Sequence, residues 1–428
     1  MAKASNIRWR ILTLLCLSSF VSYTLRANIS TAAPFMIEDL ALTEIQWGWV
    51  LAAFTTGYAL FQIPGGILGD SIGPKRALTM IAVLWGVFTL LTALVPGQEM
   101  GTATILTSLI LVRFLVGVSH APIFPVQNGS IQRWFPAGNW AFPSGLSSTG
   151  LTLGVALTTP LLVWMITEIG WRYSFIALAP LAFIVAALWW WYSTDNPAEH
   201  IHTNTEEVAF IKAKRAIAED DVNETISWVV VLKNRDILLL TISYFCMTFV
   251  FYEVFSWFFY YLVEIRGFSA QQAGYLTASQ WICGAIGAAL GGWICDKLCA
   301  RMGLRWGCRW PAIIGMLLSA VLLISGALMS DPYIAMLMFV FCFLFNQMTE
   351  GAYWATSIAI GGRYCGTAAG IMNTGGNISG VIGALLIPFS AKYLGWEFAI
   401  ATGGIFAIIG AGLWLFISAD KPLTEQVI

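Results

Sequence analysis

Charged residues are scarce in this chain. Lys, Arg, Asp and Glu together make up 11% of its 428 residues, whereas hydrophobic residues make up 58%. A soluble globular protein carries about 25% charged residues. One aqueous core cannot bury so much apolar surface, so the composition excludes a soluble protein and predicts an integral membrane protein.

The side-chain sets that mark a membrane enzyme or a metalloprotein are also missing. The chain has only three His, and its short predicted outside loops hold no acidic or His cluster. Cys295 and Cys299 are four residues apart, but no further Cys or His completes a zinc set. The eight cysteines fall in apolar spans or on the predicted cytoplasmic side, where disulfides are rare. We therefore predict no enzyme activity, no metal, no cofactor and no disulfide framework.

Apolar runs near the length that crosses a bilayer, about 20 residues, recur along the whole sequence. They predict an all-α membrane protein whose twelve transmembrane helices cover residues 11–36, 45–68, 77–96, 103–126, 140–167, 173–194, 236–263, 271–295, 310–330, 333–360, 367–393 and 397–418. With both termini cytoplasmic, 17 of the 22 Lys and Arg lie inside and three, Arg172, Arg266 and Lys392, lie outside. Because Lys and Arg concentrate on the cytoplasmic side of membrane proteins, this bias predicts that orientation, in the inner (plasma) membrane.

The two halves of the sequence resemble each other at a nearly constant offset. "GGILGD" at 65–70 returns as "GGWICD" at 291–296, 226 residues later, and Gly170-Trp171 returns as Gly395-Trp396, 225 residues later. Such an internal repeat is typical of secondary transporters, whose binding site lies near the bilayer midplane between the repeats.

The repeat predicts three parts of the chain. Residues 1–195 and 236–428 should each form a six-helix bundle, and residues 196–235 should form a cytoplasmic linker. The linker is rich in charges, including Glu206 and Glu207, which favours a solvated segment with a short surface helix.

The stretch "GGILGDSIGPKR" at 65–76 resembles the loop signature of the major facilitator superfamily of transporters, Gly-x-x-x-Asp-x-x-Gly-x-Lys/Arg-Lys/Arg. The matching residues are Gly66, Asp70, Gly73, Lys75 and Arg76; Asp296 is a partial copy of Asp70, and Arg113-x-x-x-Gly117 resembles a second signature of the family. The resemblance implies a structural and gating role for these residues. We expect the glycines to let two helices approach closely and Asp70 to accept hydrogen bonds from a neighbouring helix N-terminus.

Other stretches resemble the anion:cation symporter branch, which includes sialin, vesicular glutamate transporters and bacterial sugar-acid carriers. They are "LRANISTAAPFM", "GYALFQIPGG", "GWRYSF", "NPAEH" and "GIMNTGGNISG", in both halves. The resemblance implies transport of a small organic carboxylate by alternating access, often coupled to protons, and we expect a monomer. It implies Arg26 as the carboxylate anchor, with further contacts from Tyr23, Tyr58, Asn373 and Trp354. Asn377, on the same helix face as Asn373, is either another contact or an interhelical hydrogen-bonding residue.

Two positions depart from the family pattern. Leu25 stands where bacterial members often carry Asp, and His120 stands where the fourth helix often carries Glu. Both missing carboxylates are associated with proton coupling, so the coupling group has moved or the chain is an uncoupled facilitator, an exchanger or a transporter-like sensor. The candidate proton carriers are Glu350, Glu253 and His120, each of which is alternatively part of a structural polar network. His120 is also a candidate substrate contact, and Pro122 and Pro125 should break the helix directly after it.

Arg26 is the only charge between Ile11 and Ile37. An arginine at the centre of a membrane helix costs roughly 2.5–3.5 kcal/mol on insertion scales, so its position needs a reason. One interpretation is that it binds a substrate carboxylate in a water-filled cavity. The other is a structural ion pair with Glu253, which lies 227 residues later at nearly the equivalent place in the repeat.

Overall fold

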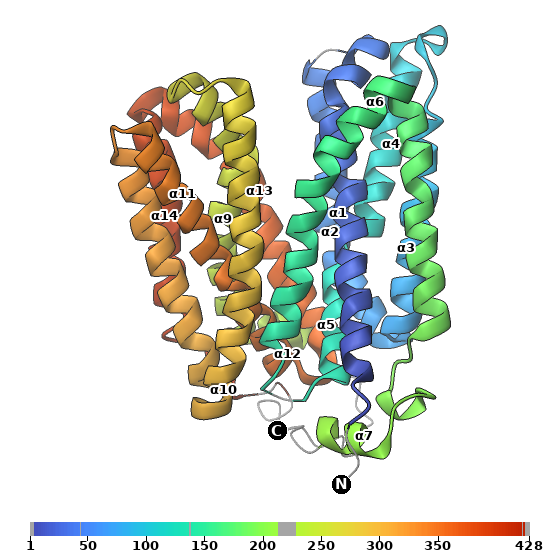
Figure 1. Cartoon of the computed structure of the whole chain (residues 1–428), viewed down its shortest axis with the longest axis vertical. Helices are drawn as coiled ribbons and strands as arrows, with labels where there is room; N and C mark the ends of the chain where they lie inside the picture. The colour runs from blue at the N-terminus through green and yellow to red at the C-terminus, as the bar shows by residue number, and fades with distance from the viewer. Residues whose placement is uncertain (1–3, 43, 137, 213–227, 422, 424–428) are drawn as a thin grey trace.

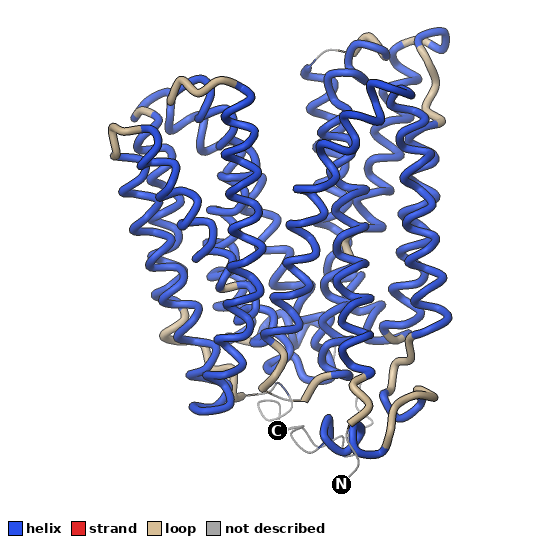
Figure 2. The backbone as a smooth tube through the Cα atoms, viewed as in Figure 1, coloured by secondary structure: helices blue, strands red, loops and turns tan. Residues whose placement is uncertain are grey.

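The computed structural model describes residues 4–42, 44–136, 138–212, 228–421 and 423, and every regular element in these ranges is a helix (Figure 1; Figure 2). The helices of the first half are α1 (Ile7–Asp39), α2 (Glu44–Ile72), α3 (Pro74–Ala93), α4 (Thr102–His120), α5 (Ile123–Trp134) and α6 (Ala141–Tyr192). Two short helices, α7 (Thr205–Lys212) and α8 (Trp228–Lys233), flank residues 213–227, which lie outside the described residues. The second half holds α9 (Arg235–Tyr260), α10 (Ala270–Leu328), α11 (Pro332–Met348), α12 (Glu350–Gly361), α13 (Cys365–Leu394) and α14 (Trp396–Leu413).

Two of these helices contain a reversal of the chain. Gly170 in α6 (φ 77°, ψ 161°) and Gly303 in α10 (φ 79°, ψ 166°) have non-helical backbone angles. A positive φ of this kind is strained for residues that carry a Cβ, so glycine suits both turns. The region from 296 to 309, predicted as a loop, is therefore helical on both sides of Gly303.

Nine segments of the described chain are long and apolar enough to cross a membrane. Two of them, Tyr275–Leu328 and Pro332–Gly383, span 54 and 52 residues and contain more than one helix of membrane length. The chain is therefore a multi-pass helical membrane protein, and the count of twelve crossings stays a prediction.

The helix break predicted after His120 is present. The helix α4 ends at His120, and α5 begins at Ile123. The indole N–H of Trp85 donates to the Ser119 carbonyl oxygen (2.9 Å) at the end of α4. A second break separates α11 from α12 at Thr349, next to Glu350.

The helices α1–α6 gather in one bundle and α9–α14 in another, and both chain ends lie at the same end of the molecule (Figure 1). At that end a carboxylate of each half caps a helix of the other half. Asp70 of α2 accepts hydrogen bonds from the backbone N–H groups of Gly366 (3.0 Å) and Thr367 (2.9 Å) at the start of α13. Asp296 of α10 accepts from the N–H groups of Ala141 (2.9 Å) and Phe142 (3.1 Å) at the start of α6. A negative charge at a helix N-terminus is stabilising, so the two contacts hold this end closed.

Glycines beside these carboxylates allow the helices to meet. A Cβ on Gly66 would lie 2.2 Å from the carbonyl oxygen of Gly366, and a Cβ on Gly292 would lie 2.5 Å from the carbonyl oxygen of Ala141. Gly66 and Gly292 occupy the same place in the repeated "GGILGD" and "GGWICD" motifs. The repeat seen in the sequence thus corresponds to two matching helix contacts between the halves.

The linker is not wholly solvated, because Glu207 of α7 is buried against the start of α1. Its carboxylate accepts hydrogen bonds from the Ser5 hydroxyl and the backbone N–H of Ile7 (2.9 Å), and it forms an ion pair with Arg8 (3.0 Å). The carboxylate caps the N-terminus of α1, where the backbone N–H groups have no helical partner. The Glu207 carboxylate therefore stabilises the fold. Of the two neighbouring glutamates, only Glu206 faces solvent.

We expect Glu207→Ala to lower the thermal unfolding midpoint of the purified protein, because it removes the ion-pair partner of Arg8 and leaves the first N–H groups of α1 without their acceptor, at a cost of about 3 kcal/mol. The exposed neighbour provides the control, and Glu206→Ala should unfold like the wild type. Burial raises the pKa of Glu207, but the hydrogen bonds from Ser5, Ile7 and Arg8 and the Arg8 charge lower it more, to below its usual value. Its contribution is therefore complete above the ordinary carboxylate pKa and is lost as the pH falls through the lower folded value. Equal midpoints for wild type and Glu207→Ala at neutral pH would contradict this role.

Candidate functional site

A cavity lies where the two halves face each other. Its walls come from α1, α2, α5, α6, α9, α11, α12 and α13. The lining residues are Tyr23, Arg26, Tyr58, Phe124, Ser148, Leu151, Tyr244, Thr248, Phe251, Tyr252, Gln347, Glu350, Trp354, Asn373, Gly376 and Asn377. Arg26 and Glu350 are the two charged residues in this lining, one from each half.

Arg26 is held by aromatic side chains. Its guanidinium lies about 5 Å from the ring centres of Tyr23 (5.0 Å), Phe54 (5.1 Å) and Tyr58 (5.0 Å) and donates a hydrogen bond to the Tyr23 hydroxyl (2.9 Å). Tyr252, from the other half, also lies close enough to interact with it. Aromatic faces attract a cation and fix its position without neutralising its charge.

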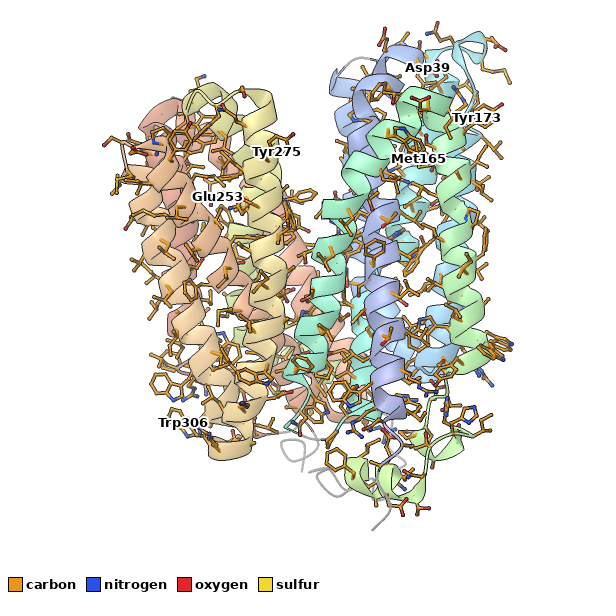
Figure 3. All side chains as sticks on the ribbon, viewed as in Figure 1. Asp39, Met165, Tyr173, Glu253, Tyr275 and Trp306 are labelled. Carbon is orange, nitrogen blue, oxygen red and sulfur yellow. The ribbon has the colours of Figure 1, made fainter. Side chains whose placement is uncertain are left out.

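The alternative interpretation, in which Arg26 is paired with Glu253, is wrong. Within the described part of the chain, the ion pairs are Arg8–Glu207, Arg133–Asp195 and Arg172–Asp39. Glu253 lies within the α9–α14 bundle (Figure 3), where its carboxylate abuts Gly403 of α14. It does not line the cavity, and neither of its oxygens accepts a hydrogen bond of ordinary geometry. The equivalence in the repeat did not predict proximity, because α1 and α9 belong to different bundles.

Glu350 stands on the opposite wall of the cavity from Arg26, at the start of α12. Its carboxylate accepts a hydrogen bond from the indole N–H of Trp354 (2.7 Å) and a longer one from the Tyr244 hydroxyl (3.4 Å). The break between α11 and α12 places this carboxylate on a helix end that faces the cavity. The carboxyl group of Glu350 therefore faces the same cavity as the Arg26 guanidinium.

Asn373 and Asn377 line the cavity and also hold it together. Asn373 donates to the side-chain oxygen of Gln62 on α2 (3.0 Å), across the boundary between the halves. Asn377 donates to the Asn373 carbonyl (2.7 Å) and accepts from the Tyr252 hydroxyl (2.8 Å). The interhelical hydrogen bonds considered for these asparagines are present, and their contact with a substrate stays a prediction.

His120 lies outside the cavity lining. Its ring stacks on Trp85 (centroids 5.1 Å apart), and its Nδ1 atom lies 2.9 Å from the Val116 carbonyl oxygen. The side chain is buried, with its ring centre 6.0 Å from that of Phe54. The structure therefore does not bring His120 to the cavity that Arg26 and Glu350 line.

Arg113 is buried beside the same aromatic ring. Its guanidinium lies 4.9 Å from the ring centre of Phe54, and Gly117 one turn later packs against the Phe54 carbonyl of α2. The first half thus places two guanidinium groups, those of Arg26 and Arg113, around one phenylalanine. Of the two, only Arg26 lines the cavity.

The other signature residues position the loop after α2. Gly73 (φ 84°) begins the turn into α3, and the backbone N–H of Lys75 donates to Asp195 (2.8 Å). The Lys75 ammonium lies 5.5 Å from the Trp190 ring centre, and Arg76 is exposed. These residues lie at the closed end, away from the cavity.

Sequence reasoning missed nine residues of the cavity lining: Phe124, Ser148, Leu151, Tyr244, Thr248, Phe251, Tyr252, Gln347 and Gly376. Tyr244 and Tyr252 are eight residues apart on α9, so they share a helix face. An apolar span rich in aromatic residues hides such a pair, because only the packing of α9 against α13 decides which aromatics face the cavity.

Residues 15–303 match the family model of the Major Facilitator Superfamily. This chain is a member of that superfamily. The resemblance inferred from residues 65–76 is confirmed, and the protein is a membrane transporter rather than an enzyme.

Relatives and solved structures agree with this assignment. The chain is 29% identical to a probable sulfoacetate transporter of Cupriavidus necator, over 99% of this chain and 97% of that protein. It is 30% identical to a probable galactarate/D-glucarate transporter of Bacillus subtilis, over 96% of this chain and 90% of that protein. Its fold matches that of a proton:xylose symporter with a TM-score of 0.77, at 14% identity and 98% coverage of both chains.

We expect Asp70→Asn to increase the fraction of molecules in which the end of the protein closed by Asp70 is open. The substitution weakens charge-assisted hydrogen bonds to the start of α13, and a loss of about 2 kcal/mol would shift the ratio of closed to open molecules roughly 30-fold. Spin labels at exposed Ser71 and Arg301 report the separation of the halves there by double electron–electron resonance. Asp39→Asn, at the far end of the molecule (Figure 3), is the matched control and should leave the distances unchanged. Identical distance distributions for Asp70→Asn and wild type would exclude a gating role for this carboxylate.

Proposed function

We propose that this protein is a secondary active transporter that moves a small organic anion, a carboxylate such as a sugar acid, by alternating access and in symport with a proton. The observation that carries the proposal is Arg26, a guanidinium in the wall of a cavity between the halves whose neighbours are aromatic rings and hydroxyls rather than a carboxylate. A guanidinium offers a planar pair of donors that matches a carboxylate, and it stays charged at any working pH. A substrate carboxylate would complete this environment.

The remaining cavity wall suits the rest of a sugar acid. Asn373, Asn377 and Gln347 provide amide groups for hydroxyls, while Tyr244 and Trp354 provide flat apolar faces. The named relatives are probable transporters of small organic anions, sulfoacetate in one case and the sugar acids galactarate and D-glucarate in the other. These features favour an acid with a polar body over a purely apolar one.

The charges in the cavity support proton coupling. A substrate anion at Arg26 shares the cavity with the carboxylate of Glu350, and a substrate with a second anionic group would meet that carboxylate directly. Protonation of Glu350 removes the repulsion, since like charges in a low-dielectric site cost several kcal/mol. We therefore assign proton coupling to Glu350, with Glu253 and His120 as the less favoured candidates because neither lines the cavity.

An uncoupled facilitator or exchanger, or a transporter-like sensor, is the second candidate function. It is favoured by Leu25 and His120, which stand where related carriers often have carboxylates. Counterflow of labelled substrate in proteoliposomes separates the candidates. A pH gradient should drive accumulation by the symporter but change nothing in an uncoupled carrier.

We further propose that both termini face the cytoplasm and that the protein acts as a monomer in the inner (plasma) membrane. The bias of Lys and Arg supports the orientation. In that orientation, Asp70 and Asp296 close the cytoplasmic end.

A binding screen on the purified protein tests the proposed substrate class. Sulfoacetate, D-glucarate, D-galactonate and a hexuronate should raise the unfolding temperature, because a ligand that binds only the folded state stabilises it. Galactose and galactitol, which lack the carboxylate, are the controls and should have no effect. Stabilisation by the neutral sugars but by none of the acids would reject an organic anion as the substrate.

A further inference from the structure

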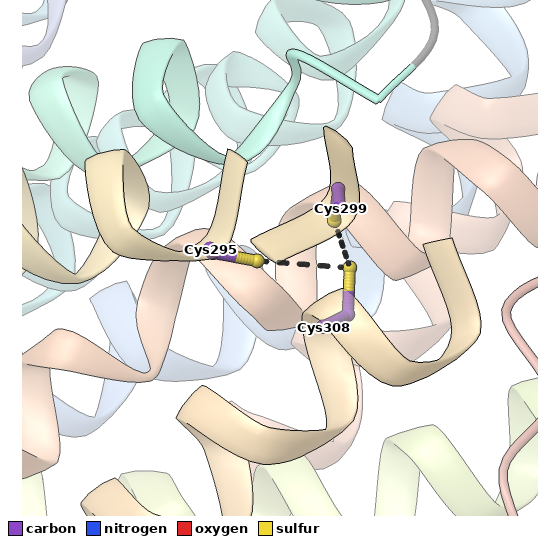
Figure 4. A group of neighbouring side chains, drawn as sticks. All are labelled: Cys295, Cys299 and Cys308. Carbon is purple, nitrogen blue, oxygen red and sulfur yellow. Dashed lines mark hydrogen bonds between the residues drawn. The ribbon is translucent and has the colours of Figure 1, made fainter. Parts of the chain in front are cut away.

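Three cysteine thiols meet inside α10, away from the cavity (Figure 4). The Sγ atom of Cys308 lies 3.7 Å from that of Cys295 and 3.7 Å from that of Cys299, and all three lie within 4.8 Å of one another. All three are buried and are free thiols. From the sequence alone Cys295 and Cys299 had no partner that completes a set, and the fold provides Cys308.

The reversal at Gly303 creates the cluster. Cys295 and Cys299 lie one turn apart on the first limb of α10, and Cys308 lies on the second limb. Gly307 allows the limbs to touch, since a Cβ there would lie 2.4 Å from the Cys299 Cα atom and 2.6 Å from its Sγ atom. The three thiols therefore lie together because the reversal at Gly303 folds the second limb of α10 back onto the first.

The sulfur spacing fits a metal site. A cation with metal–sulfur bonds of about 2.3 Å, as for zinc, separates its sulfur ligands by about 3.8 Å in tetrahedral geometry. The separations of 3.7 Å from Cys308 to both other sulfur atoms match this value. They are far longer than the roughly 2.05 Å of a disulfide bond, so the thiols are close but unbonded.

A fourth donor is close to the sulfur atoms. The hydroxyl of Thr356, on α12, lies beside the Cys308 thiol. Thr356 is completely buried, and its oxygen has no hydrogen-bond partner of ordinary geometry. A buried hydroxyl without a partner costs free energy, and a ligand in the cluster would satisfy it.

We propose that Cys295, Cys299 and Cys308 form a binding site for one soft d10 cation, Zn²⁺ or Cu⁺, with Thr356 beside it as an oxygen donor. Thiolate ligands select such cations over Mg²⁺ or Ca²⁺, which prefer oxygen. Each thiol that coordinates the cation releases its proton to solvent. The site joins the two limbs of α10 directly beside Asp296, which closes this end against α6.

Cadmium is the probe, since thiolate–cadmium bonds give an ultraviolet charge-transfer band. We expect the reduced full-length protein in detergent to bind one Cd²⁺ per chain with this band. Zn²⁺ and Cu⁺, added separately, should each displace the cadmium, and their relative potency identifies the preferred ion. Cys308→Ser should lose the band. Cys283→Ser, which alters a cysteine on the same helix outside the cluster, should keep it.

Folding of each variant is checked by its elution profile and thermal unfolding. If Cys308→Ser does not fold, the same cadmium titration on Cys299→Ser tests the site. The number of metal ions bound to the wild type, measured by native mass spectrometry, then provides a second test. The proposal is overturned if the reduced wild type shows neither the band nor one bound cation, or if a folded cluster variant keeps the band. A band lost equally in Cys283→Ser would also overturn it.

Discussion

Purified Arg26→Ala should bind no organic carboxylate in the concentration range in which the wild type saturates. The substitution removes the positive charge from the cavity lining and leaves Glu350 as its one charged residue. Hydrogen bonds between charged groups contribute about 1.5–3 kcal/mol each, and a guanidinium makes two of them to one carboxylate. Isothermal titration with the acid that gives the largest thermal shift measures the loss.

Arg26→Lys separates charge from geometry. Lysine keeps the charge but lacks the planar pair of donors, so we expect affinity to fall by about 2 kcal/mol, or roughly 30-fold. Arg10→Ala, on the exposed part of the same helix, is the matched control and should bind like the wild type. Both Arg26 variants should still fold, since a lone charge in the membrane is costly rather than stabilising. Unchanged affinity in Arg26→Ala would reject Arg26 as the anchor.

The second large effect concerns Glu350. In proteoliposomes, Glu350→Gln should abolish accumulation driven by a pH gradient, because glutamine cannot carry a proton, whereas the wild type should accumulate substrate about tenfold per pH unit in a one-to-one electroneutral symport. Exchange of labelled for unlabelled substrate should persist, because exchange needs no net proton movement. Glutamine retains a carbonyl oxygen that accepts a hydrogen bond from the Trp354 indole.

Glu253→Gln is the matched control for this experiment. It removes the other buried carboxylate candidate of the second half, which abuts Gly403 outside the cavity. We expect this variant to accumulate substrate like the wild type. If Glu253→Gln loses accumulation while Glu350→Gln retains it, the coupling role belongs to Glu253.

Much of the fold could be predicted from local patterns in the sequence. Long apolar runs mark the helices, and the offset repeat at 65–70 and 291–296 marks the pair of matching contacts made by Asp70 and Asp296. Arg26 stood out because one charge in a long apolar run has few explanations. These features depend on composition and spacing, which a sequence shows directly.

Other features depend on packing between distant segments, and the sequence did not reveal them. Glu207 looked like one of many linker charges until the fold placed it against the start of α1. Cys308 lies nine residues beyond Cys299 with no recognisable spacing, and only the reversal at Gly303 brings the two together. His120 filled a position in a motif, yet its side chain packs against Phe54 and Trp85 and does not line the cavity.

The most direct test of the central claim is the structure of this protein with a bound carboxylate, determined by cryo-electron microscopy at a resolution that shows side chains. We expect density for the carboxylate within hydrogen-bond distance of the Arg26 guanidinium, between Tyr23 and Tyr58, with the body of the acid directed toward Glu350 and Trp354. Ligand density elsewhere, with the Arg26 guanidinium still bonded only to tyrosine hydroxyls, would contradict the account.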